Sequence, residues 1–259
     1  MDVPEPVRRL ALYPFHELPV SPDDERVELE GAFITINRWP NAQIVGIRGD
    51  GPADVRAAVD AARAVGREHG KTVVAWWVPP DQDHVRPALE QAGLVNEDTP
   101  GFEAIENALA VLERPGGSAV EGVQVRMTET WDDYRAAARV VEIAFDMPHV
   151  TDDELRSRYD DYRHPDNPGR GFVAVIDGRV VGTSYAAFGD AGVNLFGGAV
   201  LPDARGRGVY RALVQARWEA AAARGTPALT VQAGRMSRPI CERLGFGFLA
   251  PVRVLVDQL

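Results

Sequence analysis

One order of elements occurs twice in the 259-residue chain. In the second half, apolar patterns predict a strand, a long helix, a strand, a short helix and a last strand, over 193–201, 208–224, 228–232, 237–244 and the residues after Gly245. The first half repeats this order in shorter form, over 43–47, 53–69, 72–78, 83–92 and 102–112. The repetition predicts a duplicated architecture of strands and helices.

Further elements are predicted before the second copy of the repeat. A strand is expected over 123–127, followed by a helix that Thr130 caps. Thr151 and Glu154 have the spacing of a capping box at the start of another helix. Two strands, over 172–176 and 180–188, flank Asp177-Gly178, which is a strong hairpin signal.

A turn-rich segment separates the two halves. Residues 113–118 contain two glycines and a proline between segments of regular apolar pattern. We therefore expect one domain over 1–115 and a second over 119–259, because a chain of this length has room for two modest domains.

Composition excludes several classes of protein. The apolar share of 45% and the charged share of 25% are those of an ordinary globular protein. No apolar run reaches the ~20 residues that a membrane span needs, and the acidic N-terminus does not resemble a secretory signal. The single cysteine, Cys241, excludes an intrachain disulfide and a multi-cysteine metal site. We expect a reducing, cytoplasmic setting and no metal.

Charge is unevenly distributed along the chain. The net charge is −10, and residues 1–120 hold 11 Lys+Arg against 20 Asp+Glu. An acidic chain does not favour nucleic-acid binding, because phosphate affinity requires a basic face. It would favour a cationic small molecule or peptide, although the same acidity also serves solubility.

The strongest motif lies at residues 200–213, where a predicted strand enters a glycine-bearing loop that opens directly into a helix. Glycines allow a ligand to approach the backbone closely, and the first amides of a helix have no intrahelical partner. Together they predict an anion site for a phosphate or pyrophosphate. Arg205, Arg207 and Arg211 add positive charge.

Two other phosphate-binding loops fit less well. A Walker loop needs a Lys followed by Ser or Thr after the glycines, which this loop lacks. A dinucleotide fingerprint needs three glycines and a later acid after a second strand, whereas Glu219 lies inside the predicted helix.

The loop resembles the pyrophosphate loop of the GNAT superfamily of N-acetyltransferases: Arg205 and Gly208 stand at the first and last positions of its Arg/Gln-x-x-Gly pattern. Tyr210 departs from the usual small residue. The resemblance extends from about Val123 to the C-terminus and includes the ending Leu244-Gly245-Phe246. It implies an α/β (α+β) fold with a mixed, mostly antiparallel sheet flanked by helices, duplicated here.

The resemblance also implies that acetyl-coenzyme A binds where two parallel strands, 194–200 and 228–232, separate. Its binding residues would be Ala199, Val200, Arg205, Gly206, Arg207, Gly208, Val209, Tyr210 and Arg211. The implied reaction is direct transfer, in which an amine attacks the thioester and its proton leaves by a base or water chain. A backbone N–H near Val200 would polarise the carbonyl oxygen.

The catalytic acid is where this sequence departs from the family. Many members have a Tyr at the position of Cys241, and a frequent Asn is replaced by Gly234. The Cys241 thiol could donate a proton, or could be a small buried residue. Ser237 could reach the leaving thiolate, or could be a helix N-cap.

No carboxylate lies on the predicted strand 193–201, so a base must come from elsewhere. Glu142, Asp146, His149 and Asp190 are candidates, beside a water relay from backbone carbonyls. In this family the segment 146–150 would line the acceptor pocket.

The first half carries a formal match to the loop at residues 48–53. However, Pro52 has no N–H, and Asp50 and Asp54 place negative charge beside the expected phosphate. We expect a degenerate, truncated GNAT-like domain that packs on the active one, with Trp76 and Trp77 in its core or at the interface.

These features predict an N-acetyltransferase that moves an acetyl group from acetyl-coenzyme A to a primary amine of a small molecule or peptide. The alternative is a non-catalytic acyl-coenzyme A-binding regulatory or interaction protein. The acceptor is expected to be amine-bearing and cationic, and a homodimer is one possible assembly; no nucleic acid and no membrane partner is expected.

Overall fold

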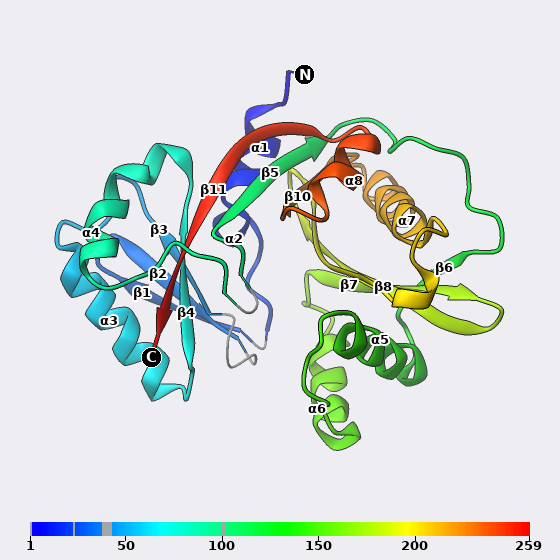
Figure 1. Ribbon diagram of the computed structural model, residues 1–259, viewed down its shortest axis with the longest axis horizontal. Helices are drawn as coiled ribbons and strands as arrows, with labels where there is room; N and C mark the ends of the chain where they lie inside the picture. Colours follow the sequence, from blue (N-terminus) through cyan, green and yellow to red (C-terminus); the bar gives the residue numbers. More distant parts are fainter. Residues whose placement is uncertain (1, 23, 38–42, 100–101) are drawn as a thin grey trace.

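The computed structural model describes residues 2–22, 24–37, 43–99 and 102–259. Within them, eleven strands form one sheet in the order β1-β2-β3-β4-β11-β5-β10-β9-β8-β7-β6 (Figure 1). The strands are β1 Glu25–Leu29, β2 Ala32–Ile36, β3 Gln43–Ile47, β4 Val73–Val78, β5 Ile105–Val111, β6 Gln124–Met127, β7 Gly169–Ile176, β8 Arg179–Gly189, β9 Gly192–Val200, β10 Leu229–Ala233 and β11 Gly247–Gln258. Two pairs, β3/β4 and β9/β10, are parallel, and the other eight are antiparallel.

Helices cover both faces of this sheet. They are α1 Glu5–Leu12, α2 Pro14–Glu17, α3 Val55–Glu68, α4 Arg86–Gln91, α5 Trp131–Ala144, α6 Asp152–Tyr162, α7 Val209–Ala223 and α8 Arg238–Arg243, with two short 3₁₀ turns, η1 Pro80–Val85 and η2 Pro202–Ala204. Figure 1 shows α7 and α5 on opposite sides of β7 and β8. Helix α1 packs on β5, β9, β10 and β11 in the centre of the sheet.

The predicted repeat is present, since β3-α3-β4-α4-β5 and β9-α7-β10-α8-β11 follow the same order. The final strand of each copy nevertheless pairs with the other copy. Strand β5 pairs with β10, and β11 pairs with β4 over its second half. The two final strands also pair with each other. Each half of the chain therefore completes the sheet of the other half.

The exchange of final strands affects the predicted division of the chain into two domains. The segment between β5 and β6 contains the predicted boundary, and it lies against the second half: the Gly116 amide donates to the Leu244 carbonyl, and Gln215 Nε2 donates to the Gly117 carbonyl at 2.8 Å. The two domains over 1–115 and 119–259 stay a prediction, because β5 and β4 of the first half pair with β10 and β11 of the second half.

Local signals act as the sequence predicts. Thr130 caps α5 by accepting a bond from the Asp133 amide, and Thr151 and Glu154 form a complete capping box at α6. Asp177 and Gly178 both have positive φ, as a type I′ hairpin requires. Trp76 and Trp77 are buried, as predicted, in two apolar clusters on opposite faces of the sheet.

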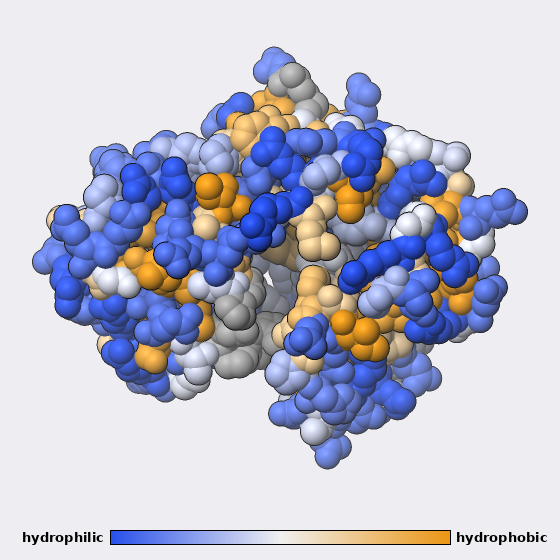
Figure 2. Space-filling model, in the orientation of Figure 1, coloured by the Kyte–Doolittle hydropathy of each residue, from blue (hydrophilic) through white to orange (hydrophobic). Residues whose placement is uncertain are grey.

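Some expectations needed adjustment. Helix α3 begins at Val55, two residues later than predicted, because Asp54 is its N-cap. The predicted short helix over 83–92 is a 3₁₀ turn that continues into α4. Helices α1 and α2 and the hairpin of β1 and β2 were not predicted. Figure 2 shows that the molecule is hollowed between its two lobes in this view.

Candidate functional site

The glycine loop presents backbone amides at the start of α7. Gly206 and Gly208 have φ values of 77° and 79°, in the left-handed region that glycine adopts without strain. The first helical bond runs from the Ala212 amide to the Gly208 carbonyl, and no side chain caps the helix. Among the described residues, the amides of 206–211 donate no backbone hydrogen bond to any segment outside the loop and α7. Such a helix terminus is suited to an anion.

The three arginines of the motif are not equivalent. Arg205 and Arg207 are exposed beside the helix terminus, and Arg205 Nε donates to the Val200 carbonyl at 3.3 Å. The side chain of Arg211 packs between the linker and the loop: its Cδ lies 2.9 Å from where a Cβ on Gly117 would stand, and its Nη2 lies 3.5 Å from where a Cβ on Gly208 would stand. All three arginines therefore place positive charge at the loop.

Strands β9 and β10 separate beside this loop. Their parallel pairing includes only Val193 to Leu195 and Leu229 to Val231. Beyond it, β9 continues to Val200 on β8, and β10 continues to Ala233 on β5. The predicted separation of the two strands is therefore present, and Ala199 and Val200 lie on its β9 side.

The Tyr210 ring lies across this separation. A Cβ on Gly198 of β9 would meet the Tyr210 ring at 2.6 Å, and the Tyr210 hydroxyl lies 3.7 Å from the Cys241 sulfur on α8. Burial raises the pKa of Tyr210, so its hydroxyl is protonated at neutral pH. A ligand arm that runs between α7 and α8 at this level must displace the ring.

Cys241 is fully buried, and burial raises the pKa of its thiol. Arg217, 1% exposed, lies two turns after Tyr210 on α7 and donates to the carbonyls of Leu213 and Tyr185. Desolvation lowers the pKa of this guanidinium. The Cys241 thiol is therefore neutral and packed among apolar side chains. Its role as a catalytic acid stays a prediction.

Ser237 is the N-cap residue of α8, but its side chain makes no capping bond. Its hydroxyl donates weakly, at 3.4 Å, to the Gly234 carbonyl, and no side-chain cap bond is formed. Ser237 therefore occupies the expected N-cap position of α8, but its hydroxyl is directed back toward the preceding turn and makes no capping bond. Its role toward the leaving thiolate stays a prediction.

The proposed acceptor segment is held by Glu142. This carboxylate accepts from the Val150 amide at 2.8 Å and from Arg139 at 2.6 Å, and these contacts help to lower its pKa. Asp146 is exposed after α5, with a positive φ of 52°, and the His149 side chain is largely exposed. Asp190 lies in the turn before β9, at the opposite end of that strand from the separation.

Two carboxylates that we had not singled out lie nearer to the separation. Glu103 places a carboxylate oxygen 2.4 Å from where a Cβ on Gly234 would stand, just beyond the end of β10. Glu106 lies on β5, one residue before Asn107, which pairs with Ala233. In the sequence, Glu106 stands out only as an acidic residue within a short apolar strand. The strands on both sides of β5 come from the other half of the chain.

The first-half counterpart is closed. Strands β3 and β4 stay paired from Gln43 to Gly46, almost the full length of β3. The terminus of α3 is occupied by the carboxylate of Asp54, which accepts from the Ala57 amide at 3.0 Å. Neither a strand separation nor a free helix terminus is present in this described region, so it has no counterpart of the second-half loop.

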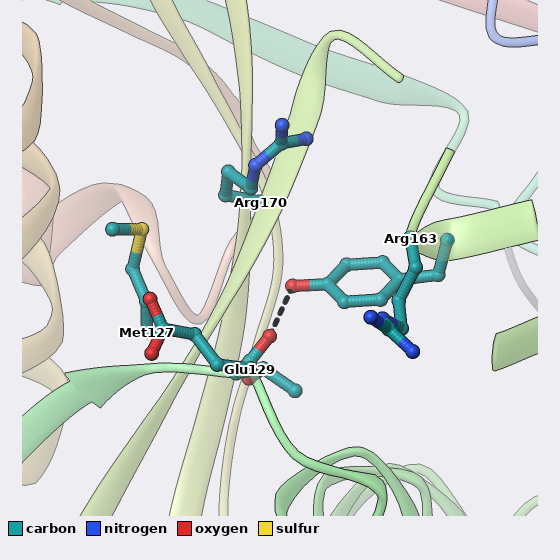
Figure 3. Close-up of a pocket in the computed structure, with 6 residues that line it drawn as sticks. Met127, Glu129, Arg163 and Arg170 are labelled. Carbon is teal, nitrogen blue, oxygen red and sulfur yellow. Dashed lines mark hydrogen bonds between the residues drawn. The ribbon is translucent and has the colours of Figure 1, made fainter. Parts of the chain in front are cut away.

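A cavity of about 290 Å³ opens elsewhere, between β6, β7 and the end of α6 (Figure 3). Its lining residues are Met127, Thr128, Glu129, Tyr162, Arg163 and Arg170. The Tyr162 hydroxyl donates to the Thr128 carbonyl at 2.8 Å and holds α6 against β6 (Figure 3). This cavity is at the edge of the sheet, away from the β9–β10 separation.

Two searches concerned metals and membranes. Among the residues that the structure describes, no group of three or more His, Cys, Asp or Glu is placed to hold a metal ion. In the same residues, none of the helices has the length and apolar character needed to span a bilayer.

Comparisons with known proteins found similar sequences and structures. The profile of the acetyltransferase (GNAT) family matches residues 129–246. A GCN5-related N-acetyltransferase from Kribbella flavida is 15% identical, with a TM-score of 0.69 over 97% of this chain and 95% of that chain. A tandem GNAT protein from the clavulanic acid biosynthesis pathway is 14% identical, with a TM-score of 0.62 over 97% and 93%. A search of curated proteins found no match.

These likenesses concern the fold. A GCN5-related N-acetyltransferase from Sphaerobacter thermophilus is 20% identical, with a TM-score of 0.58 over 88% of this chain and 76% of that chain. The two neighbours above cover nearly all of this chain, and one of them is a tandem protein. The predicted fold class, with its mixed, mostly antiparallel sheet flanked by helices, is confirmed.

Proposed function

Because residues 129–246 belong to the acetyltransferase (GNAT) family, we propose that the chain transfers an acetyl group from acetyl-coenzyme A to a primary amine of a small molecule or peptide. The observation that carries the proposal is the set of backbone amides at 206–211. Among the described residues they donate to no segment outside the loop and α7, and they stand beside the separated strands β9 and β10. A diphosphate supplies the anionic oxygens that such amides bind.

The residues of this chain fit the coenzyme in two respects. Gly206, Arg207, Gly208, Val209, Tyr210 and Arg211 would bind the diphosphate through their amides, with Arg205 and Arg207 adding charge. Ala199 and Val200 would direct backbone groups toward the pantetheine arm. When bound, acetyl-coenzyme A supplies an activated acyl group, and the protein contributes position and polarisation of the carbonyl oxygen.

Reaction requires a neutral amine, since an ammonium has no electron pair to attack a carbonyl. Amines are mostly protonated at neutral pH, so the site must take up a proton. The net charge of −10 favours a cationic acceptor. A reducing, cytoplasmic setting and a homodimer are further parts of this proposal.

A specific observation favours the alternative of acyl-coenzyme A binding without turnover. The Tyr210 ring crosses the strand separation, and the neutral Cys241 thiol occupies the position where many family members have a Tyr. Thiol release over a panel of polyamines, aminoglycosides, amino acids and N-terminal peptides separates the two functions. Coenzyme binding with no turnover on the whole panel would favour the binding protein.

The loop assignment is tested with Gly→Asp variants. In Gly206→Asp, the new side chain meets no neighbour, so the protein should fold, and a carboxylate would repel the diphosphate. We expect coenzyme A affinity, measured by isothermal titration calorimetry, to fall about 100-fold. Gly208→Asp should act likewise but also contacts Val120.

Gly225→Asp is the matched control, because Gly225 also has positive φ and open space but lies at the other end of α7. Its affinity should stay within about twofold of the wild type. Equal affinity in Gly206→Asp and Gly225→Asp would refute the loop assignment.

A further inference from the structure

Strand β5 belongs to the first half of the chain but borders the candidate site. Asn107 Nδ2 donates to the Ala233 carbonyl at 3.0 Å, and Asn107 Oδ1 accepts from Arg238 of α8 at 2.7 Å. The start of β5 is thereby fixed at the carboxyl end of β10, where β10 has already separated from β9.

Side-chain alternation assigns the residues of β5 to two faces. Leu109 and Val111 pack with the α7 and α8 cluster, whereas Ala108 packs with Ala11 and Ala110 packs with Val7 of α1. Successive side chains of a strand point to opposite faces, and the pairing of β5 with β10 is regular. Glu106 therefore lies on the α1 face, opposite the face where α7 and α8 would hold the coenzyme.

Helices α7 and α8 cover the first face, and α1 covers the opposite face beside Ala108 and Ala110. An acceptor amine would therefore approach the separation on the opposite face past the end of α1, at the start of β5. Glu106 is half-buried there, next to the end of β10. In the described structure, no hydrogen bond or ion pair joins its carboxyl group to another residue. A carboxyl group in this position is available to a ligand.

We propose that Glu106, supplied by the first half of the chain, is the catalytic base that removes a proton from the acceptor ammonium. The proposal rests on the proposed function. Glu106 carboxylate takes one proton from the ammonium, and the amine nitrogen then forms a bond to the acetyl carbon. The carbon–sulfur bond breaks, its electron pair stays on sulfur, and the second amine proton passes to that sulfur. The Glu106 proton then leaves to solvent.

The electrostatic surroundings agree with this role. Burial raises the pKa of Glu106 to about 7, and the nearby Glu103 carboxylate adds to the effect. A base titrating near the working pH is the efficient one. Charged groups on the neighbouring segments are already paired: Arg235 with Asp98 and Glu103, Arg253 with Asp83, and Glu17 with Arg9, while burial lowers the pKa of His16 to about 4.

The test compares Glu106→Gln with the wild type on the most active amine of the panel. We expect kcat/KM for the amine to fall about 100-fold, the range of a lost general base, with coenzyme A affinity unchanged. The wild-type rate should rise with pH through about 7, and this limb should be absent from Glu106→Gln. Glu97→Gln is the control and should behave as wild type, because it changes an exposed carboxyl group nine residues earlier in the sequence.

The outcomes separate the two proposals. An active wild type whose rate and pH limb survive in Glu106→Gln overturns the role of Glu106 and leaves the transferase intact. If no amine is turned over, the transferase proposal fails, and Glu106 is then tested by carboxyl ¹³C NMR with spermidine as the probe. A Glu106 resonance that spermidine does not shift overturns the proposed amine contact.

Discussion

The ionised Glu106 carboxylate should lower the free energy of unfolding at high pH, and Glu106→Gln should restore it. The folded protein raises the pKa of this carboxyl from 4.5 to about 7, so folding favours the protonated form. Stability from this group is complete below about pH 4.5 and is lost as the pH rises to about 7. At about 1.4 kcal/mol for each pH unit between these values, the loss is about 3 kcal/mol at most, since the side chain keeps some solvent exposure.

Urea unfolding followed by tryptophan fluorescence at pH 4 and pH 8 measures this effect. The difference in unfolding free energy between Glu106→Gln and wild type should shift in favour of the variant by up to about 3 kcal/mol between the two pH values. The free-energy cost of burying the amide group that this substitution introduces is the same at both pH values, so it cancels in the comparison. Glu97→Gln, an exposed change, should show no such shift. Parallel pH curves for Glu106→Gln and wild type would refute the argument.

Two further predictions concern the contact between the halves and the ring in the strand separation. Asp257 of β11 holds Arg63 of α3 through two bonds of 2.8 and 3.0 Å and is 4% exposed, so Asp257→Ala should lower the free energy of unfolding by about 3 kcal/mol in urea titrations. The double variant Arg63→Met/Asp257→Leu should lose about 1 kcal/mol or less, and equal losses in both would contradict a buried-charge effect. Tyr210→Ala removes the ring that lies on Gly198, so coenzyme A should bind about 10-fold more tightly by calorimetry; unchanged or weaker binding would show that the ring is outside the coenzyme path.

Exchange of the final strands changes what the first half contributes. Its own loop is closed by Asp54, and its parallel strands stay paired, so it lacks the features that would bind a coenzyme. It nevertheless supplies β5, which carries Glu106 to the edge of the second-half site. The first half therefore contributes a strand to the candidate site of the second half although it has no such loop itself.

Prediction from sequence succeeded where the cause is local. Thr130 and Thr151 cap helices because their hydroxyls reach amides three residues away, and Asp177-Gly178 turns because both residues tolerate positive φ. The glycines of the loop act in the same way, since Gly206 and Gly208 adopt left-handed φ within the loop itself. None of these features needs a distant partner.

Prediction failed where the cause is the identity of a distant neighbour. The apolar pattern of 105–111 indicates a buried strand, but the pattern does not show whether that strand lies beside β4 or β10. The position of Tyr210 in its motif indicates an amide donor, yet its ring contacts Gly198 and Cys241, which are separated from it in sequence. Ser237 stands at the expected N-cap position, but its hydroxyl bonds to the Gly234 carbonyl, so no side-chain capping bond forms.

By itself, the sequence determined the repeated order of strands and helices, the helix ends and the glycine loop, because each depends on residues within a few positions of one another. Tertiary structure alone decided which strand completes which half, where the Tyr210 ring lies and that Glu106 borders the second-half site. Those outcomes depend on hydrogen-bond pairing and burial between segments that are distant in the sequence, more than a hundred residues apart for β5 and β10. Many pairings satisfy the same local pattern, and only the complete packing selects one.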